Sequence, residues 1–264
     1  KMKTTTASSL SAMKANGEKF AVITAYDFTF SKLIENAEIE VILVGDSLGN
    51  VIQGRDSTIP VTVDEMAYHT EAVKRGNNRA LLVTDMPFMS YANEVQALEN
   101  AATLMQAGAQ MVKLEGGEWL AETVHLLTER GIPVCGHVGL TPQSVHKLGG
   151  YKVQGKEEQA AAQMIADAKA LESAGAELIV VECVPSSLGR ELSEVLDIPV
   201  IGIGAGPDTD AQVLVLHDML GISQRLPRFS KNFLDDNLSI QEAITAYGNA
   251  VRSGTFPAAE HCFK

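Results

Sequence analysis

Short β-branched runs that alternate with longer amphipathic stretches predict an α/β fold for this chain. Eight such units follow one another within 264 residues, a length that suits one large domain. Parallel β-α units in this number predict a closed (βα)8 barrel, the TIM barrel. A doubly wound open sheet is the alternative architecture that the same alternation allows.

The expected strands are the runs 20–27, 41–47, 80–88, 111–117, 133–139, 178–184, 199–206 and 212–220. Amphipathic stretches between them predict helices, for example over 62–76, 93–108 and 157–175. Thr62 with Glu65 forms a capping box at the start of the first of these helices. The segment 204–212 is too short for a full helix, so the last unit is expected to be irregular. Residues 1–264 are expected to form a single barrel domain with a short N-terminal helical extension.

Charge and composition argue against several classes of protein. The net charge of -12 leaves no basic stripe that could neutralise phosphates, so no nucleic-acid partner is expected. No run reaches the ~18 apolar residues of a membrane span, and the N-terminal residues lack the apolar core of a signal peptide. The three cysteines (Cys135, Cys183 and Cys262) lack metal-type spacing. Reduced thiols and a cytoplasmic protein without a membrane partner are therefore expected.

Polar side chains stand at or near the carboxyl ends of six predicted strands: Asp27, Asp46, Asp85, Glu115, His137 and Glu182. In barrel enzymes the catalytic groups converge at that end of the strands. An isolated aspartate just after a strand can equally be the N-cap of the next helix. Matching positions on several strands nevertheless predict a polar site at the mouth of the barrel.

The run 111–117 carries two charged residues inside an otherwise apolar strand. Because side chains alternate along a strand, Lys113 and Glu115 share one face, and Val112 and Leu114 share the other. An unpaired charge inside a protein costs several kcal/mol, so the charged face is expected to open into the polar mouth.

Asp46, Asp85 and Glu115 offer hard oxygen donors from three adjacent strands, a set that favours magnesium over zinc. A 2-oxo acid could chelate such an ion, which would act as a Lewis acid and stabilise an enolate. Lys113 could hold the substrate carboxylate or the developing negative charge.

Glu182 follows four apolar residues, and such surroundings raise the pKa of a carboxyl group toward neutrality, which suits a general base. The alternative is a glutamate satisfied by backbone amides or by a surface arginine. His137 has an equally ordinary alternative as a hydrogen-bonded core histidine. The glycines around Tyr151 predict a flexible loop that could act as a lid.

Several stretches, in this order, resemble the ketopantoate (3-methyl-2-oxobutanoate) hydroxymethyltransferase family. They are VGDSLGNVIQGRDSTIPVT, YHTEAVKRG, ENAATLMQAGAQMVKLEGG, GIPVCGHVGLTPQSV, GGYKVQG and IPVIGIGAG. The resemblance extends from about Thr4 to the C-terminal FPAAEH. Ala211 stands where the family usually has glycine, and Cys262 stands where serine is common.

The resemblance implies a barrel of the phosphoenolpyruvate/pyruvate type that transfers a hydroxymethyl unit from 5,10-methylenetetrahydrofolate to 3-methyl-2-oxobutanoate. The product, 2-dehydropantoate, belongs to pantothenate biosynthesis, and the reaction passes through an enolate stabilised by Mg2+, one ion per subunit. At the matching positions the resemblance implies metal ligands Asp46, Asp85 and Glu115, substrate contacts Asp46, Ser47, Asp85 and Lys113, and the proton acceptor Glu182. His137 matches a pocket residue. A homo-oligomer, often a decamer, is also implied.

Two other functions remain open at this point. A magnesium-dependent lyase or mutase on the same barrel would cleave or rearrange a 2-oxo acid. A catalytically silent barrel would bind an acidic metabolite without exchanging its protons. The presence of Asp46, Asp85, Lys113, Glu115 and Glu182 together argues against the silent barrel.

Overall fold

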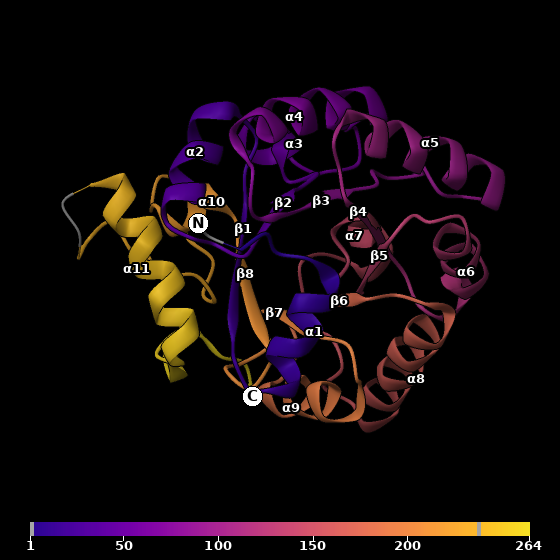
Figure 1. The fold of residues 1–264 in the computed structure, drawn as a ribbon. Coiled ribbons are helices and arrows are strands. Elements are labelled where there is room, and N and C mark those ends of the chain that lie inside the picture. Colours follow the sequence, from indigo (N-terminus) through magenta and orange to yellow (C-terminus); the bar gives the residue numbers. More distant parts are fainter. Residues whose placement is uncertain (1–2, 237–238) are drawn as a thin grey trace.

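The computed structural model describes residues 3–236 and 239–264 and shows a closed barrel of eight parallel strands (Figure 1). The strands, which neighbour each other in chain order, are β1 (Phe20–Thr24), β2 (Val41–Val44), β3 (Leu81–Asp85), β4 (Met111–Glu115), β5 (Val134–Gly139), β6 (Leu178–Glu182), β7 (Val200–Ile203) and β8 (Ala211–Leu214). Val22 of β1 lies opposite both Val41 of β2 and Val213 of β8, and this pairing closes the barrel. The predicted fold class is confirmed, and the open sheet is excluded.

Helices surround the barrel (Figure 1). The longer ones are α2 (Phe28–Asn36), α4 (Val63–Gly76), α5 (Glu94–Ala107), α6 (Ala121–Glu129), α8 (Glu158–Ala174), α9 (Ser186–Val195) and α11 (Ile240–Ser253). Single-turn helices follow three strands: α3 (Leu48–Val51), α7 (Val145–Leu148) and α10 (Leu216–Met219). Short 3-10 turns cover Glu118–Leu120, Pro142–Ser144 and Ala259–His261.

Side chains of the strands alternate between two buried layers, as the pleat of a strand requires. One layer fills the barrel and includes Val22, Leu43, Val83, Met111, Cys135, Val180 and Val213. The other packs against the helices and includes Ile23, Ile42, Leu82, Val112, Leu114, Ile179 and Leu214. Lys113 and Glu115 share the alternation of Met111 and line the cavity at the mouth. The expectation that this charged face opens into a polar space is confirmed.

Seven of the eight predicted strands extend past the residue at which the observed strand ends, and only 133–139 ends as predicted, at Gly139. The first ends at Thr24, and Asp27 is instead the N-cap of α2, where its side chain accepts a hydrogen bond from the Phe30 backbone N–H at 2.8 Å. The last ends at Leu214, because the chain turns into α10, which buries its apolar side chains under the helical layer. No helix separates β7 from β8, so the irregular last unit is confirmed.

The helix signals in the sequence hold in the structure. Thr62 and Glu65 form the predicted capping box of α4. Gly108 and Gly175 end α5 and α8 with φ angles of 124° and 116°, which side chains with a Cβ rarely adopt. Both glycines turn the chain directly into a strand, and so Glu115 and Glu182 end equivalent units.

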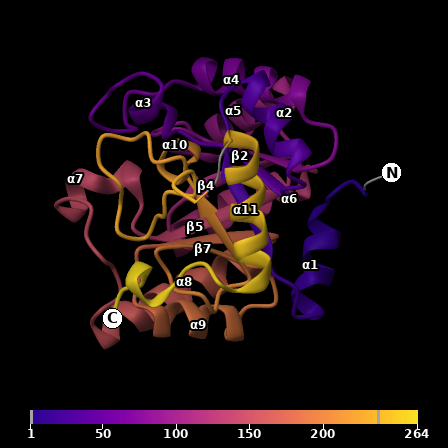
Figure 2. The same ribbon diagram turned by 90° about the vertical axis from the view of Figure 1, so that its left-hand side faces the viewer.

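Helix α1 (Ala7–Ala15) lies at the end of the barrel where the strands begin, opposite α3 and α7 (Figure 2). Leu10 is fully buried against the interior layer of the barrel. The Lys14 ammonium donates to the carbonyls of Ser193, Leu196 and Ile198 at 2.8–2.9 Å, and it lies 3.1 Å from Asp210 Oδ2. Lys14 therefore ties α1 to the end of α9 and to the start of β8.

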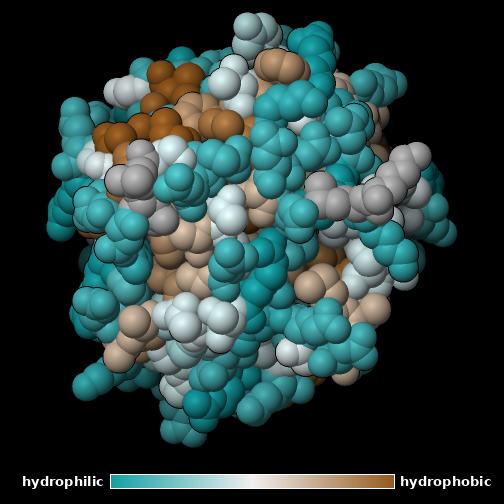
Figure 3. Space-filling model, turned by 60° about the vertical axis from the view of Figure 1, so that its left-hand side comes forward, coloured by the Kyte–Doolittle hydropathy of each residue, from teal (hydrophilic) through white to brown (hydrophobic). Residues whose placement is uncertain are grey.

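The face seen in Figure 3 is largely hydrophilic, with one group of apolar side chains near its upper edge. Polar and charged residues thus cover most of this side of the barrel. Within residues 3–236 and 239–264, no helix is long and apolar enough to span a membrane.

Replacing Lys14 with methionine is expected to lower the free energy of unfolding by about 2–4 kcal/mol, because three carbonyls and one carboxylate lose their donor. Urea denaturation followed by circular dichroism measures the change. Lys32→Met is the matched control, since Lys32 is 47% exposed and lies 3.9 Å from Glu35. Equal losses in the two variants would contradict the role assigned to Lys14.

Candidate active site

A cavity of about 890 Å³ opens at the carboxyl ends of the strands. Residues at or just after each of the eight strands line it: Thr24, Asp46, Asp85, Glu115, His137, Glu182, Ile203 and Val215. Ser47, Lys113 and Tyr151 also line it. The structure therefore brings together every candidate site residue from the sequence except Asp27, which is exposed on the outside.

Lys113 is buried beside Asp85, its neighbour across the β3–β4 pair. The Lys113 ammonium lies 3.0 Å from Asp85 Oδ1, while Asp85 Oδ2 accepts from the Asp46 backbone N–H at 2.9 Å. Burial alone would lower the pKa of Lys113, but Asp85 and the other nearby carboxylates outweigh it and hold the pKa above its usual value. Lys113 is therefore charged.

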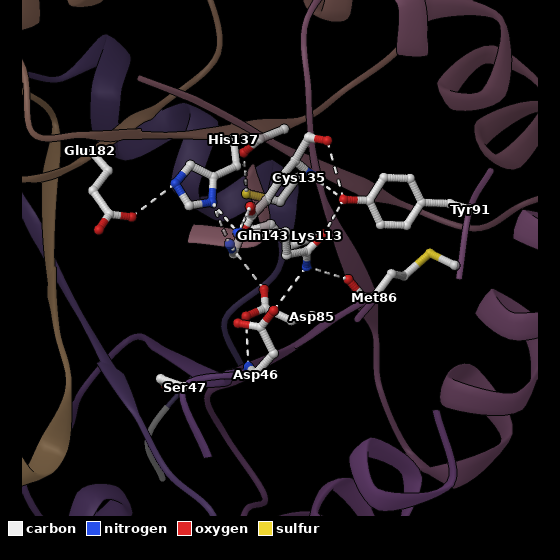
Figure 4. Close-up of polar contacts among 12 residues, drawn as sticks. Asp46, Ser47, Asp85, Met86, Tyr91, Lys113, Cys135, His137, Gln143 and Glu182 are labelled. Atoms are coloured by element: carbon white, nitrogen blue, oxygen red, sulfur yellow. Dashed lines mark hydrogen bonds and ion pairs between the residues drawn. The ribbon is translucent and has the colours of Figure 1, made fainter. Parts of the chain in front are cut away.

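His137 joins Lys113 to Glu182 (Figure 4). The Lys113 ammonium donates to His137 Nδ1 at 2.8 Å, which leaves Nε2 as the protonated nitrogen of a neutral ring. Burial and the charge of Lys113 lower the pKa of His137 well below its usual value, in agreement with a neutral ring. Nε2 lies 3.0 Å from Glu182 Oε2, in contact but without the alignment of a hydrogen bond.

Glu182 ends β6 in surroundings that raise its pKa to about 8, mainly because burial disfavours the charged form, while Lys113 works in the opposite direction. This agrees with the expectation from the apolar run before it. Its backbone lies against Gly139 of β5, whose φ is 91°. A Cβ at Gly139 would lie 2.3 Å from the Glu182 carbonyl oxygen, so only glycine allows this close pairing.

Gln143, which the sequence analysis missed, connects two carboxylates of the site (Figure 4). Its side-chain amide donates to Asp46 Oδ2 at 2.8 Å, and its backbone N–H donates to Glu115 Oε2 at 3.0 Å. Tyr91 donates its hydroxyl proton to the Gln143 side-chain oxygen or to the Glu115 carbonyl. The signal in the sequence was a polar residue four positions after the end of the strand at Gly139, and polar residues are common in loops.

Asp46 and Glu115 are both fully buried, and burial is the main cause of their raised pKa values. The pKa of Glu115 rises to about 8, and that of Asp46 rises well above its usual value, with the Asp85 charge adding to the effect. Acids this close together repel each other when charged, and a cation between them would relieve the repulsion.

Ser47 reaches the cavity beside Asp46. Its hydroxyl lies 2.7 Å from the hydroxyl of Tyr26, which in turn donates to Thr24 Oγ1 at 2.9 Å. Tyr26 is buried and so fixes the direction of the Ser47 hydroxyl from beneath. Tyr26 is a second functional residue that the sequence alone did not indicate.

The oxygen donors at the mouth suit a hard divalent cation. Among the described residues, no three His, Cys, Asp or Glu side chains form a ready-made metal cage. Mg2+, however, is usually held by one or two carboxylates and completes its shell with water and substrate oxygens. Asp85 Oδ1 lies 3.0 Å from the Lys113 ammonium but accepts no hydrogen bond inside the described part of the chain, so it keeps a lone pair for a cation. The residues present fit Mg2+.

The model of the ketopantoate hydroxymethyltransferase family matches residues 4–259. The chain belongs to this family. Over 263 residues, 99% of either chain, it is 60% identical to 3-methyl-2-oxobutanoate hydroxymethyltransferase of Colwellia psychrerythraea strain 34H. This protein is therefore an enzyme, a hydroxymethyltransferase.

Solved structures share the barrel of this hydroxymethyltransferase at low sequence identity. The phosphoenolpyruvate phosphomutase of Streptomyces platensis subsp. rosaceus has a TM-score of 0.62 at 13% identity, over 92% of this chain and 95% of that one. A phosphonopyruvate hydrolase in complex with oxalate and Mg2+ has a TM-score of 0.61 at 14% identity, over 97% and 93%. The likeness shows that these proteins share the closed barrel fold of this chain.

Replacing Gln143 with methionine is expected to lower kcat/KM for hydroxymethyl transfer by roughly 10- to 100-fold, because Asp46 loses the partner that orients it. Isothermal titration with Mg2+ is expected to show a weaker ion affinity by a similar factor. Gln163→Met on the exposed face of α8 is the control. Unchanged kinetics and ion affinity in the Gln143 variant would show that this contact does not position the acid.

Proposed function

We propose that this hydroxymethyltransferase transfers the one-carbon unit of 5,10-methylenetetrahydrofolate to C3 of 3-methyl-2-oxobutanoate. The product is 2-dehydropantoate, in pantothenate biosynthesis, with water as the source of the new hydroxyl oxygen. The observation that carries this proposal is the buried chain from Asp85 through Lys113 and His137 to Glu182, which sets a raised-pKa carboxylate beside a fixed positive charge. Proton abstraction next to a carbonyl group needs both groups.

Asp46, Asp85 and Glu115 are proposed to hold one Mg2+ ion. Bound there, the ion would supply a Lewis acid for the oxygens of a 2-oxo acid. The fit rests on the hard oxygen donors and on the raised pKa values of Asp46 and Glu115, and Asp85 Oδ1 forms an ion pair with Lys113 but accepts no hydrogen bond. A barrel of the same fold binds Mg2+ together with oxalate, a small diacid.

Glu182 is proposed to take the C3 proton onto a carboxylate oxygen. The electron pair of the broken C–H bond then moves toward the C2 oxygen. C3 forms the new bond to the one-carbon unit, the two bonds from that carbon to the folate nitrogens break, and water supplies the hydroxyl oxygen, so that tetrahydrofolate leaves. Lys113 offers a fixed positive charge to the substrate. Asp46 and Ser47 line the part of the cavity in which the substrate is proposed to bind. Neutral His137 keeps Lys113 and Glu182 apart, so the base is not neutralised by a direct ion pair with the lysine.

Proton NMR of 3-methyl-2-oxobutanoate in D2O tests the base and the substrate together. The native enzyme with Mg2+ is expected to remove the C3 proton signal, and Glu182→Gln and an EDTA-treated sample are expected to lose this exchange. Addition of methylenetetrahydrofolate is then expected to yield 2-dehydropantoate. Pyruvate-forming cleavage would instead support a lyase, and tight binding without exchange would support a silent binding protein.

The exchange rate is expected to rise with pH and to level off above about 8, because only ionised Glu182 accepts a proton and its pKa is raised to about 8. The measurement is the initial exchange rate at saturating Mg2+ across the pH range in which the fold is stable. A rate that stays flat through that range would rule out Glu182 as the group that titrates.

Three further properties stay predictions. The length predicts one barrel domain with an N-terminal helical extension, the cysteine usage predicts a cytoplasmic location, and the family resemblance implies a homo-oligomer that is often a decamer. Mass photometry of the purified chain would test the assembly. Cell fractionation with an antibody against the chain would test the location.

A further inference from the structure

The charged groups assigned above occupy one side of the mouth. Asp46, Asp85, Lys113, Glu115, His137 and Glu182 all come from strands β2 to β6 or the turns that follow them. The side formed by β7, β8 and β1 is lined differently, by apolar residues and by groups that the proposed chemistry does not use. We call this side, with Asp218, Arg225, Arg228, Phe229 and Phe263, the β8-side compartment.

The cavity is larger than its proposed inner ligand. A volume of about 890 Å³ lies near the upper end of the roughly 300–1,000 Å³ found for sites that hold drug-sized molecules. A small branched oxo acid held by Lys113 and the neighbouring carboxylates fills only part of it. The β8-side compartment therefore has room for a second and larger molecule.

Asp218 lies in α10, just after β8, and supplies a buried carboxylate to this compartment. Its Oδ1 accepts from the Ser223 hydroxyl at 2.6 Å. Its Oδ2 has no hydrogen-bond partner within residues 3–236 and 239–264, and the side chain lines the cavity. This oxygen is not enclosed by protein and reaches the cavity, where it can accept hydrogen bonds from a ligand with N–H donors.

Two arginines stand at the same side, in a chain whose net charge is -12. Arg228 lies over the ring of Phe263, with 5.6 Å from its guanidinium carbon to the ring centroid. Arg225 makes no ion pair within the described part of the chain and lies exposed at the cavity edge. Arg228 Nε donates to the Glu260 carbonyl at 3.3 Å, which leaves its terminal nitrogens and the Arg225 guanidinium to meet an anionic ligand, while Lys113 is held in the inner network.

We infer that the β8-side compartment binds the reduced folate through three contacts. The Asp218 carboxylate accepts from the ring N–H and amino groups of the pterin, the rings of Phe229 and Phe263 pack against flat parts of the molecule, and Arg225 and Arg228 bind the glutamate carboxylates of its tail. This inference rests on the proposed function, because it assigns a place to its folate co-substrate. The one-carbon unit then approaches C3 from the side opposite the carboxylates of β2 to β4.

Isothermal titration with tetrahydrofolate, which carries no transferable carbon, tests the site directly in the native chain. Asp218→Asn and the double variant Arg225→Gln with Arg228→Gln are each expected to bind it roughly tenfold more weakly. The native enzyme is expected to bind polyglutamylated tetrahydrofolate more tightly than the monoglutamate, and the double variant is expected to lose this difference. Arg190→Gln is the control, because Arg190 is an exposed arginine paired with Asp208 at 2.9 Å.

Steady-state kinetics adds a second reading. The KM for methylenetetrahydrofolate is expected to rise in both variants by about the same factor as the dissociation constant, and far more than the KM for the oxo acid. If Asp218→Asn fails to fold, the double variant Arg225→Gln with Arg228→Gln still tests the inference, because both arginines are exposed and their replacement leaves the core unchanged.

Variants that bind tetrahydrofolate as tightly as Arg190→Gln would overturn the inference and leave the proposed reaction standing. Exchange of the C3 proton by a native enzyme that binds no tetrahydrofolate would overturn the inference and the folate part of the proposed function together. Absence of both exchange and folate binding would reject the proposed function itself.

Discussion

The ammonium group of Lys113 is the charge on which the rest of the barrel mouth depends. Asp85, Asp46, Glu115 and Glu182 are all buried around it, and each feels its positive charge. Without a cation in this position, burial would raise the pKa values of Asp46, Glu115 and Glu182 still further. The lysine in turn stays charged only because the acids outweigh the effect of its own burial. The charge of Lys113 and the pKa values of the surrounding acids therefore depend on each other.

The parallel barrel makes this network possible through its register. Neighbouring strands end at the same rim, so Asp85 lies beside Lys113, and Glu115 lies beside His137. Residues from three strands thus meet without any unusual backbone path. Glu182 joins them because Gly139 allows β5 and β6 to approach closely. The mouth of the barrel is rigid where proton transfer is proposed, because strands and buried hydrogen bonds hold it.

The two ends of the barrel serve different purposes. At the end where the strands begin, α1 covers the interior layer. There Lys14 donates hydrogen bonds to backbone carbonyls and forms an ion pair with Asp210. At the other end, Lys113 uses the same kind of charge inside a cavity that a ligand can enter. The same residue type therefore stabilises the fold at one end and prepares the site at the other, as expected for barrel enzymes.

The sequence by itself determined the barrel, the alternation that turns Lys113 and Glu115 inward, and the set of strand-end acids, because these follow from local periodicity and from the shared edge of parallel strands. It could not separate Asp27, which caps a helix, from acids that face the cavity, since both stand just after a strand. The contacts made by Gln143 and Tyr26 were decided only by the tertiary structure. They join residues far apart in the chain, and no local sequence pattern indicates which loops will meet at the mouth of a closed barrel. The neutral state of His137 was decided in the same way, because it depends on burial and on the Lys113 charge.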